Sequence, residues 1–259
     1  MSCESNITIA TRTLGGETLV SFLTCVTLLD MSSFGCDYLA SLILIGLDRD
    51  ELSPTAETLI KLIEQRGTEV VVVREKPRGI GVALSVLLYE VKRKESEYCF
   101  FIDDDLIFST WHLMQLLVLC DAGADAVSYT ANDLESRVVD KIRGYQRKIR
   151  MVDPYFSVVK GWLIDALEYE WLDMLSEISS APEAAFFSRL FYELEALVFV
   201  CDNQDRPFHI FRIADDKPWA CASIEDYYAV VERVHKEGSL EDALRYSKQV
   251  ADSGWQSLD

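Results

Sequence analysis

The chain has 259 residues, of which 49% are hydrophobic, 26% charged and 11% aromatic. This composition is typical of a globular protein with a substantial core, and it excludes disordered, collagen-like and disulfide-scaffold proteins. There are 25 lysine and arginine residues against 43 aspartate and glutamate residues, which gives a formal net charge of −18. Because so acidic a surface repels phosphate backbones and anionic lipids but attracts metal cations, we expect no nucleic-acid partner.

The sequence predicts neither a transmembrane segment nor a secretion signal. The longest helix-like stretch without a charge, residues 18–29, is too short to span a bilayer, so no transmembrane segment is expected. The first ten residues contain neither lysine nor arginine, and we expect a cytoplasmic protein. Seven cysteines are scattered without a C-x-x-C pair, which favours small core residues over a zinc site or a disulfide framework.

The first half of the chain alternates short apolar runs with segments of helical periodicity. The expected strands are residues 7–10, 41–47, 69–73, 98–102 and 124–129, and the expected helices are 16–29, 54–66, 79–94 and 110–120. Runs that are apolar at every position are typical of strands covered on both faces. The pattern therefore predicts an α/β fold, with a mainly parallel sheet and helices on both faces.

Beyond residue 130 this alternation ends. The basic segment 137–150 is either a lid over a diphosphate or an ordinary solvated face. After it we expect strands at 155–159, 198–201 and 207–213, helices at 162–178 and 183–197, and further helices at the C-terminus. Since no repeat and no Pro/Gly linker interrupts the chain, residues 1–130 and 131–259 are expected to be fused into one domain, the second part being a smaller α+β unit.

Three consecutive aspartates, Asp103, Asp104 and Asp105, follow the expected strand at 98–102. Along an extended backbone Asp103 and Asp105 point the same way, so this D-x-D pattern predicts two carboxylates in one site. Such a pair repels itself unless a cation lies between, and carboxylate oxygens suit Mg²⁺ or Mn²⁺. The alternative is a solvated acidic loop at the start of the next helix.

Open parallel sheets bind ligands outside the carboxyl ends of their strands. Thr11 and Arg12 follow the first expected strand, and Asp48 follows the second. We therefore expect these side chains to collect with the aspartates on one edge of the sheet.

Four motifs occur in order along the first half: Ile7-Thr-Ile-Ala-Thr11, Leu42-Ile-Leu-Ile-Gly-Leu-Asp48, Arg78-Gly-Ile-Gly-Val-Ala83 and Phe100-Phe-Ile-Asp-Asp-Asp105. Together they resemble the nucleotide-sugar-binding half of GT-A fold glycosyltransferases, especially family-2-like enzymes. The resemblance covers residues 5–130. It implies a metal-dependent transferase that moves a sugar from a nucleoside diphosphate sugar to an acceptor hydroxyl, with Mn²⁺ or Mg²⁺ as the cofactor.

The same resemblance assigns residues to the donor nucleotide. Thr11, Arg12 and Asp48 would hold its base and ribose. Arg78 and Gly79, in the segment after the third strand, would lie beside the nucleotide.

The resemblance also assigns the metal site. Asp103 would contact the ribose, Asp104 would belong to the same donor site, and Asp105 would bind the metal at the diphosphate. His209 lies in a strand-like segment where some GT-A enzymes, notably retaining ones, present a third metal ligand. The alternative for His209 is a partly exposed strand histidine.

Two residues of the second half are candidates on the acceptor side. Glu183 follows Pro182 at the head of an expected helix, where inverting family-2-like enzymes place their base, so we expect inversion. Alternatively it is a first-turn acid favoured by the helix macrodipole. Trp162 resembles an aromatic residue that lies against an acceptor sugar, or else it packs in the core as part of the helix it begins.

Two other functions stay open. A nucleotidyltransferase can use a related fold and paired aspartates, but its Gly-rich basic signature should follow the first strand, where Gly15-Gly16 matches it poorly. A nucleotide-sugar or metal-binding module without turnover is favoured if Glu183 and His209 both lie far from Asp105.

Overall fold

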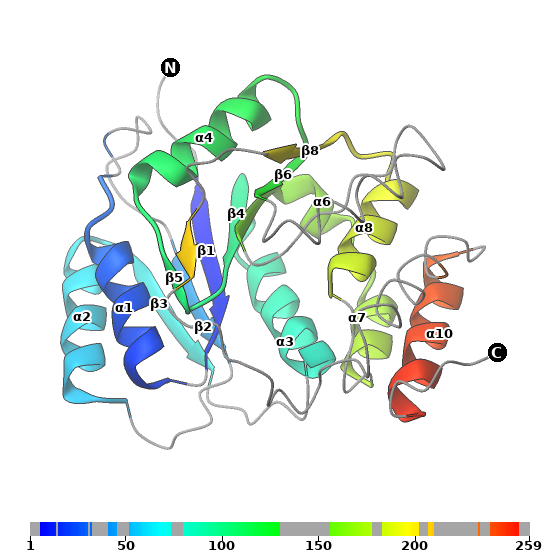
Figure 1. Ribbon diagram of the computed structural model, residues 1–259, viewed down its shortest axis with the longest axis horizontal. Helices are drawn as coiled ribbons and strands as arrows, with labels where there is room; N and C mark the ends of the chain where they lie inside the picture. Colours follow the sequence, from blue (N-terminus) through cyan, green and yellow to red (C-terminus); the bar gives the residue numbers. More distant parts are fainter. Residues whose placement is uncertain are drawn as a thin grey trace.

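The fold is built on one seven-stranded sheet in the order β3-β2-β1-β4-β7-β6-β8 (Figure 1). This computed structural model describes residues 6–13, 15–30, 32, 41–45, 52–73, 80–129, 156–177, 183–201, 207–209, 233 and 239–253. The strands of the sheet are β1 (Ile7–Arg12), β2 (Ser41–Ile45), β3 (Glu69–Val73), β4 (Tyr98–Ile102), β6 (Ala126–Tyr129), β7 (Phe156–Lys160) and β8 (Val198–Cys201). A separate two-stranded ribbon pairs β5 (Leu106–Ile107) with β9 (Phe208–His209).

One strand runs against the others. β1, β2, β3 and β4 pair in parallel, and β6 pairs in parallel with β8, whereas β7 is antiparallel to both β4 and β6. The sheet is therefore mainly parallel, as the sequence predicts. β7 and β8 belong to the second half of the chain, so both halves contribute strands to the same sheet.

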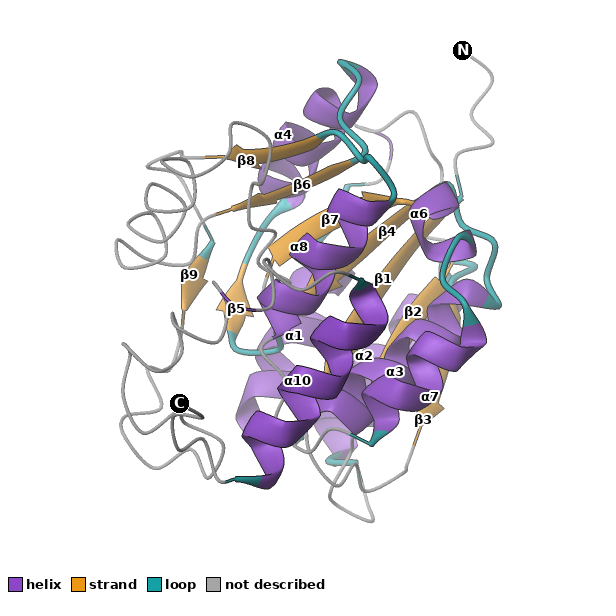
Figure 2. Cartoon of the chain, turned by 90° about the vertical axis from the view of Figure 1, so that its right-hand side faces the viewer, coloured by secondary structure: helices purple, strands orange, loops and turns teal. Residues whose placement is uncertain are grey.

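Helices cover both faces of the sheet, which confirms the expected architecture. One face is covered by α1 (Gly16–Thr27), α2 (Pro54–Gln65) and α4 (Thr110–Asp121). The other is covered by α3 (Ile80–Lys92), α6 (Gly161–Asp165), α7 (Tyr169–Ser176), α8 (Glu183–Glu193) and α10 (Leu240–Asp252). Figure 2 shows α3, α7, α8 and α10 gathered in front of the strands.

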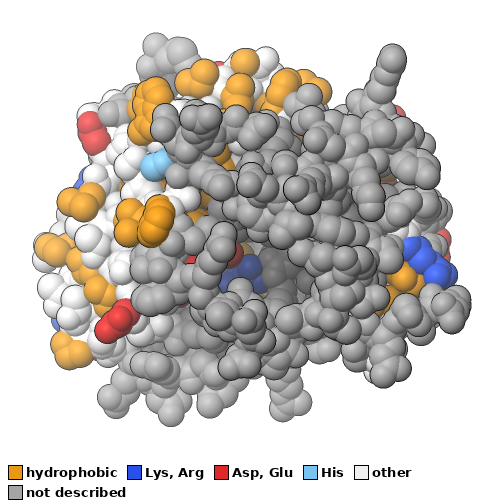
Figure 3. All heavy atoms as spheres, viewed as in Figure 1, with side chains coloured by type: hydrophobic (Ala, Val, Ile, Leu, Met, Phe, Trp, Pro, Cys, Tyr) orange, Lys and Arg blue, Asp and Glu red, His pale blue; other side chains and the backbone are white. Residues whose placement is uncertain are grey.

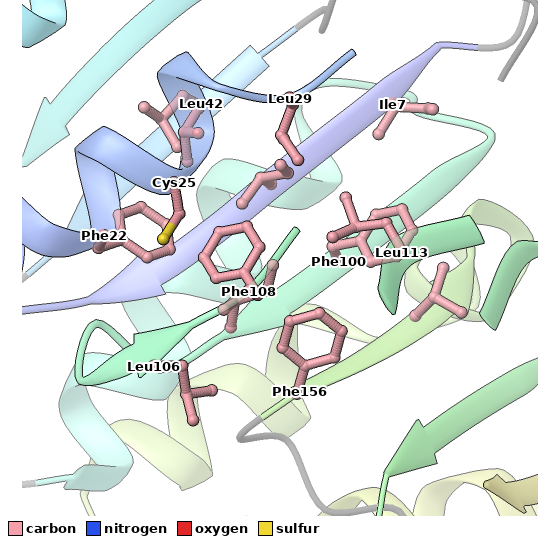
Figure 4. Packing of buried hydrophobic residues seen from close by; sticks show 14 of the residues in the cluster. Ile7, Phe22, Cys25, Leu29, Leu42, Phe100, Leu106, Phe108, Leu113 and Phe156 are labelled. Atoms are coloured by element: carbon pink, nitrogen blue, oxygen red, sulfur yellow. The ribbon is translucent and has the colours of Figure 1, made fainter. Parts of the chain in front are cut away.

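The alternation of side chains along β4 separates two hydrophobic cores. Phe100 and Ile102 pack on the side of α1, where the ring of Phe108 lies among them (Figure 4). Cys99 and Phe101 pack on the side of α3, and the ring centroids of Phe101 and Phe187 are 5.5 Å apart. Because both faces of this strand are buried, its sequence is apolar without interruption.

The described cysteines behave as core residues. Cys25, Cys99 and Cys120 are buried free thiols. Burial raises the pKa of Cys99 and of Cys120 to about 12, so both remain protonated at neutral pH.

Two expected helices end earlier than their patterns indicate. The segment at 162–178 is two helices, α6 and α7, because Glu168 has an extended backbone (ψ 142°) that starts the second one. The expected helix at 183–197 stops at Glu193, and Glu195 has a positive φ of 54°. Of the expected strand at 207–213, the structure describes 207–209. No helix in the described part of the chain is long and apolar enough to cross a membrane.

The junction of β7 and α6 is packed against the turn before β4. The Gly161 amide donates a hydrogen bond of 2.8 Å to the Glu97 carbonyl. A Cβ atom on Gly161 would lie 1.8 Å from the carbonyl oxygen of Ser96, so only glycine fits there. This backbone contact fixes the position of β7 beside β4.

We predict that Gly161→Ala lowers the free energy of unfolding by about 3 kcal/mol, because the added methyl group collides with backbone atoms. Gly67→Ala is the matched control, since a Cβ there meets open space and only the positive φ of 90° is strained, at about 1 kcal/mol. Urea denaturation measures both variants. Equal losses in the two would contradict the steric explanation.

Candidate functional site

The carboxyl ends of β1 and β4 bring two predicted residues into contact. The register of the two strands pairs Ala10 with Phe101, and beyond this pair Arg12 and Asp103 lie across from each other. Arg12 Nη2 is 3.3 Å from Asp103 Oδ1, and both side chains are partly exposed. Thr11, the residue between, is buried. An arginine and an aspartate thus meet at the edge where ligands of open sheets bind.

A small hollow opens at this edge, between the ends of β1 and β4 and helix α3. Its lining combines polar groups of the two strand ends with apolar side chains, and consists of Ala10, Thr11, Arg12, Leu84, Leu87, Phe101, Ile102 and Asp103. In the space-filling view, basic and acidic side chains are visible near one another in the middle of the face (Figure 3). The charged rim over an apolar wall suits a ligand with one polar and one apolar part.

Asp104 is turned toward β1 and α1 and is engaged by two hydroxyl groups. Thr13 Oγ1 donates a hydrogen bond of 2.5 Å to Asp104 Oδ2, and Thr18 Oγ1 donates one of 2.9 Å to the same oxygen. The Gly15 amide in turn donates to Thr13 Oγ1 at 2.9 Å. The two threonines are not among the site residues predicted from the sequence, although hydroxyl side chains beside a helix start were a usable signal.

Burial sets the protonation of Asp104. Withdrawal from solvent raises the pKa of its carboxyl to about 6, and the charges of Asp103 and Asp105 raise it further, while the hydroxyls of Thr13 and Thr18 act in the opposite direction. The folded protein therefore holds this proton more tightly than the unfolded chain does.

Asp105 lies where the chain leaves the edge. Asp104 and Asp105 form a turn between β4 and β5, so the extended backbone that would align Asp105 with Asp103 ends at Ile102. One carboxylate oxygen of Asp105, Oδ1, is shielded from solvent. In the ribbon that follows, Leu106 pairs with His209, which brings the backbone of His209 next to the aspartate turn.

Glu183 begins α8 at the same edge of the sheet. This helix leads into β8, which is parallel to β6, so the N-terminus of α8 lies toward the carboxyl ends of the strands. One turn further along, Phe187 packs against Phe101, two residues before Asp103. The start of α8 is thus on the α3 side of the candidate site.

Trp162 lies at the other edge of the sheet and is not brought to the site. Lys160 at the end of β7 pairs with Tyr98 at the start of β4, roughly 16 Å of strand away from Asp103. The indole Nε1 of Trp162 donates a hydrogen bond of 3.2 Å to Asp125 Oδ1, and the side chain is 43% exposed. Its place is in the polar junction that closes the amino-terminal edge.

Three predicted donor-binding residues, Asp48, Arg78 and Gly79, lie outside the described residues. The basic segment 137–150 lies outside them as well.

A divalent cation bound at this edge would have to share its ligands with a substrate. In the described ranges, no group of three or more His, Cys, Asp or Glu side chains is arranged to enclose a metal. Mg²⁺ and similar ions are commonly held by one or two carboxylates together with substrate phosphates. Asp103 and Asp105, at the rim of the hollow and in the adjoining turn, can supply such carboxylates.

The raised pKa of Asp104 predicts a pH-dependent stability. Because Asp104 binds its proton more tightly in the folded state, protonation of Asp104 stabilises the fold. This stabilisation is complete below the ordinary pKa of 3.8 and is lost as the pH rises through the folded-state pKa of about 6. In Asp104→Asn this loss is absent. Without metal, the stability of that variant relative to the unmodified chain should rise by about 2 to 3 kcal/mol between pH 4 and pH 7.

Urea denaturation in EDTA across this pH range measures the difference. Glu64→Gln, which removes one negative charge from an exposed position of α2, is the control. A difference that stays constant between pH 4 and pH 7 would rule out the proposed burial cost at Asp104.

Comparisons with known proteins identify the fold. No family model and no curated protein matches the sequence. TarS 1–349 from S. aureus, in complex with UDP, has a TM-score of 0.56 at 13% identity, covering 93% of this chain and 68% of that one. The mannosyltransferase PcManGT from Pyrobaculum calidifontis, in complex with GDP-Man and Mn²⁺, has a TM-score of 0.51 at 11% identity, covering 96% and 73%. The chain has the GT-A fold that its motifs predict.

Proposed function

We propose that this chain is a metal-dependent glycosyltransferase that moves a sugar from a nucleoside diphosphate sugar to an acceptor hydroxyl. The observation that carries the proposal is the contact of Arg12 with Asp103 at the carboxyl edge of a GT-A sheet, beside the aspartate turn. This arrangement puts the guanidinium of Arg12 and the carboxylate of Asp103 at one hollow, with the other two aspartates in the adjoining turn. A donor with a charged diphosphate and a polar ribose needs both kinds of partner.

The proposed roles follow the chemistry of each group. Asp103 accepts hydrogen bonds from the ribose hydroxyls, while Thr11 and Arg12 complete the nucleotide side of the hollow. The guanidinium of Arg12 is always charged and attracts the diphosphate. Asp105 and His209 would hold the metal, Mn²⁺ or Mg²⁺, which neutralises the diphosphate as it leaves.

The positions of His209 and Glu183 support catalysis over mere binding. The first pairs with the residue after Asp105, and the second begins a helix whose next turn packs against Phe101 of β4. If both residues lay far from Asp105, a binding module without turnover would be the better interpretation. In the proposed reaction Glu183 deprotonates the acceptor hydroxyl, which then attacks the anomeric carbon with inversion.

The two solved structures of similar fold agree with this donor class. TarS was crystallised with UDP, and PcManGT is a mannosyltransferase with GDP-Man and Mn²⁺. They support a nucleoside diphosphate sugar and a divalent cation as the ligands to test first. A panel of UDP-, GDP- and dTDP-sugars, with Mn²⁺ or with EDTA, would identify the donor by thermal shift.

Asp105→Ala should abolish the stabilisation that nucleoside diphosphates give in the presence of Mn²⁺. Ligand at about a hundredfold excess over its Kd stabilises the folded chain by about 3 kcal/mol, and this gain should vanish with the metal ligand. Thermal unfolding with UDP or GDP, in Mn²⁺ and in EDTA, measures it. Glu64→Ala serves as the surface control, and an undiminished Mn²⁺-dependent shift in Asp105→Ala would refute the metal assignment.

Glu183→Gln should lower kcat about a hundredfold or more, because the acceptor hydroxyl loses its general base, while donor binding is kept. Glu170→Gln is the matched control, since Glu170 is also an acid in the first turn of a helix, α7, and should leave kcat unchanged. Product configuration is measured by NMR and should be inverted. A retained anomer, or near-native kcat in Glu183→Gln, would exclude Glu183 as the base.

A further inference from the structure

The backbone contact between β1 and β4 ends before the site is reached. The last paired residues are Ala10 and Phe101. Past this point two side-chain contacts connect the strand ends, one between Arg12 and Asp103 and one from Thr13 to Asp104. The aspartate turn is thus tied to β1 by side chains instead of by the sheet.

Asp104 is held by a connected set of hydrogen bonds. The Gly15 amide donates to Thr13 Oγ1, and Thr13 uses its one hydroxyl proton toward Asp104 Oδ2. Thr18, in the first turn of α1, donates to the same oxygen. Thr13 is only 4% exposed, so water does not compete for its hydroxyl. We call Thr13, Asp104 and Thr18 the threonine clamp.

This geometry turns the middle aspartate away from the donor. Asp103 lines the hollow on the α3 side, whereas the hydroxyls that hold Asp104 come from the loop before α1 and from α1 itself. Three neighbouring carboxylates repel one another, and a turn that carries them needs fixed donors to keep one arrangement. Two hydrogen bonds to a carboxylate oxygen provide that restraint.

We propose that the threonine clamp is a positioning device: Asp104 does not touch the donor, and its bonds to Thr13 and Thr18 hold Asp103 and Asp105 where donor and metal bind. This inference rests on the proposed function, and it replaces the donor-binding role that the family resemblance gives to Asp104. The clamp acts through the aspartate turn, so its loss weakens the metal-dependent part of nucleotide binding.

Four variants and a control test the clamp in the full chain. Thr13→Val and Thr18→Val remove a hydroxyl without changing side-chain shape, and Thr13→Ser and Thr18→Ser keep the hydroxyl. Thr24→Val is the matched control, because the Thr24 hydroxyl lies on the same helix as Thr18 but bonds only its own turn, at the Val20 carbonyl. Hydrogen exchange of residues 103–107 without ligand, and UDP and GDP affinity with Mn²⁺ or EDTA, are the two readouts.

Each valine variant should weaken Mn²⁺-dependent nucleotide affinity by about tenfold, the factor expected for losing a hydrogen bond to a charged group. Affinity in EDTA, to which only Asp103 of the positioned pair contributes, should fall by a smaller factor. The serine variants should restore binding, and exchange at 103–107 should accelerate only in the valine variants. Thr18→Val keeps the test available if Thr13→Val fails to fold.

The outcomes separate the clamp from the proposed function. Unchanged exchange, or unchanged Mn²⁺-dependent affinity, in both valine variants would overturn the clamp. If the unmodified chain binds neither nucleotide with Mn²⁺, the proposed donor class fails, and the exchange data still decide whether the clamp orders the turn.

Discussion

Repulsion among the three carboxylates of residues 103–105 is the constraint on which the site depends. β4 is buried on both faces, so the turn cannot relieve this repulsion by moving the strand. Beyond the last residue of β4 the first two aspartates lie on different sides: Asp103 is on the α3 side, at the hollow, and Asp104 meets hydroxyls from the α1 side. Neighbouring carboxylates thereby face opposite sides of the sheet, one the hollow and the other the hydroxyls of Thr13 and Thr18.

The sequence predicted the sheet and the meeting of Arg12 with Asp103, because uninterrupted apolar runs locate buried strands and parallel strands end at a common edge. It did not predict the partners of Asp104. Those depend on how the chain turns after β1, where Gly15 and Gly16 both have positive φ, and such loop geometry leaves no periodic signal. β5, the partner of the expected strand that contains β9, was missed for a similar reason, since two residues are too few to show alternation.

The direction of β7 determines at which edge of the sheet Trp162 lies. Sequence spacing puts this residue directly after a strand, and after a parallel strand that would be the ligand edge. β7 is the reversed strand of the sheet, so the residues that follow it emerge at the amino-terminal edge. There Asp125 binds the indole nitrogen, and the Leu197 amide donates to the other oxygen of the same carboxylate. A pattern of apolar residues does not distinguish the two directions, which are set by pairing with distant strands.

The family resemblance connects Glu183 with a base for inversion and His209 with a metal ligand that is typical of retaining enzymes. The topology makes them compatible. α8 packs on the α3 side of the sheet through Phe187, whereas β9 pairs with β5, whose Leu106 belongs to the core on the α1 side. Glu183 and His209 thus belong to separate elements, one packed on the α3 face and the other paired with the strand that follows the aspartate turn. A metal ligand on β9 and a base at the start of α8 would therefore come from different elements, and metal ligation by His209 alone would not imply retention.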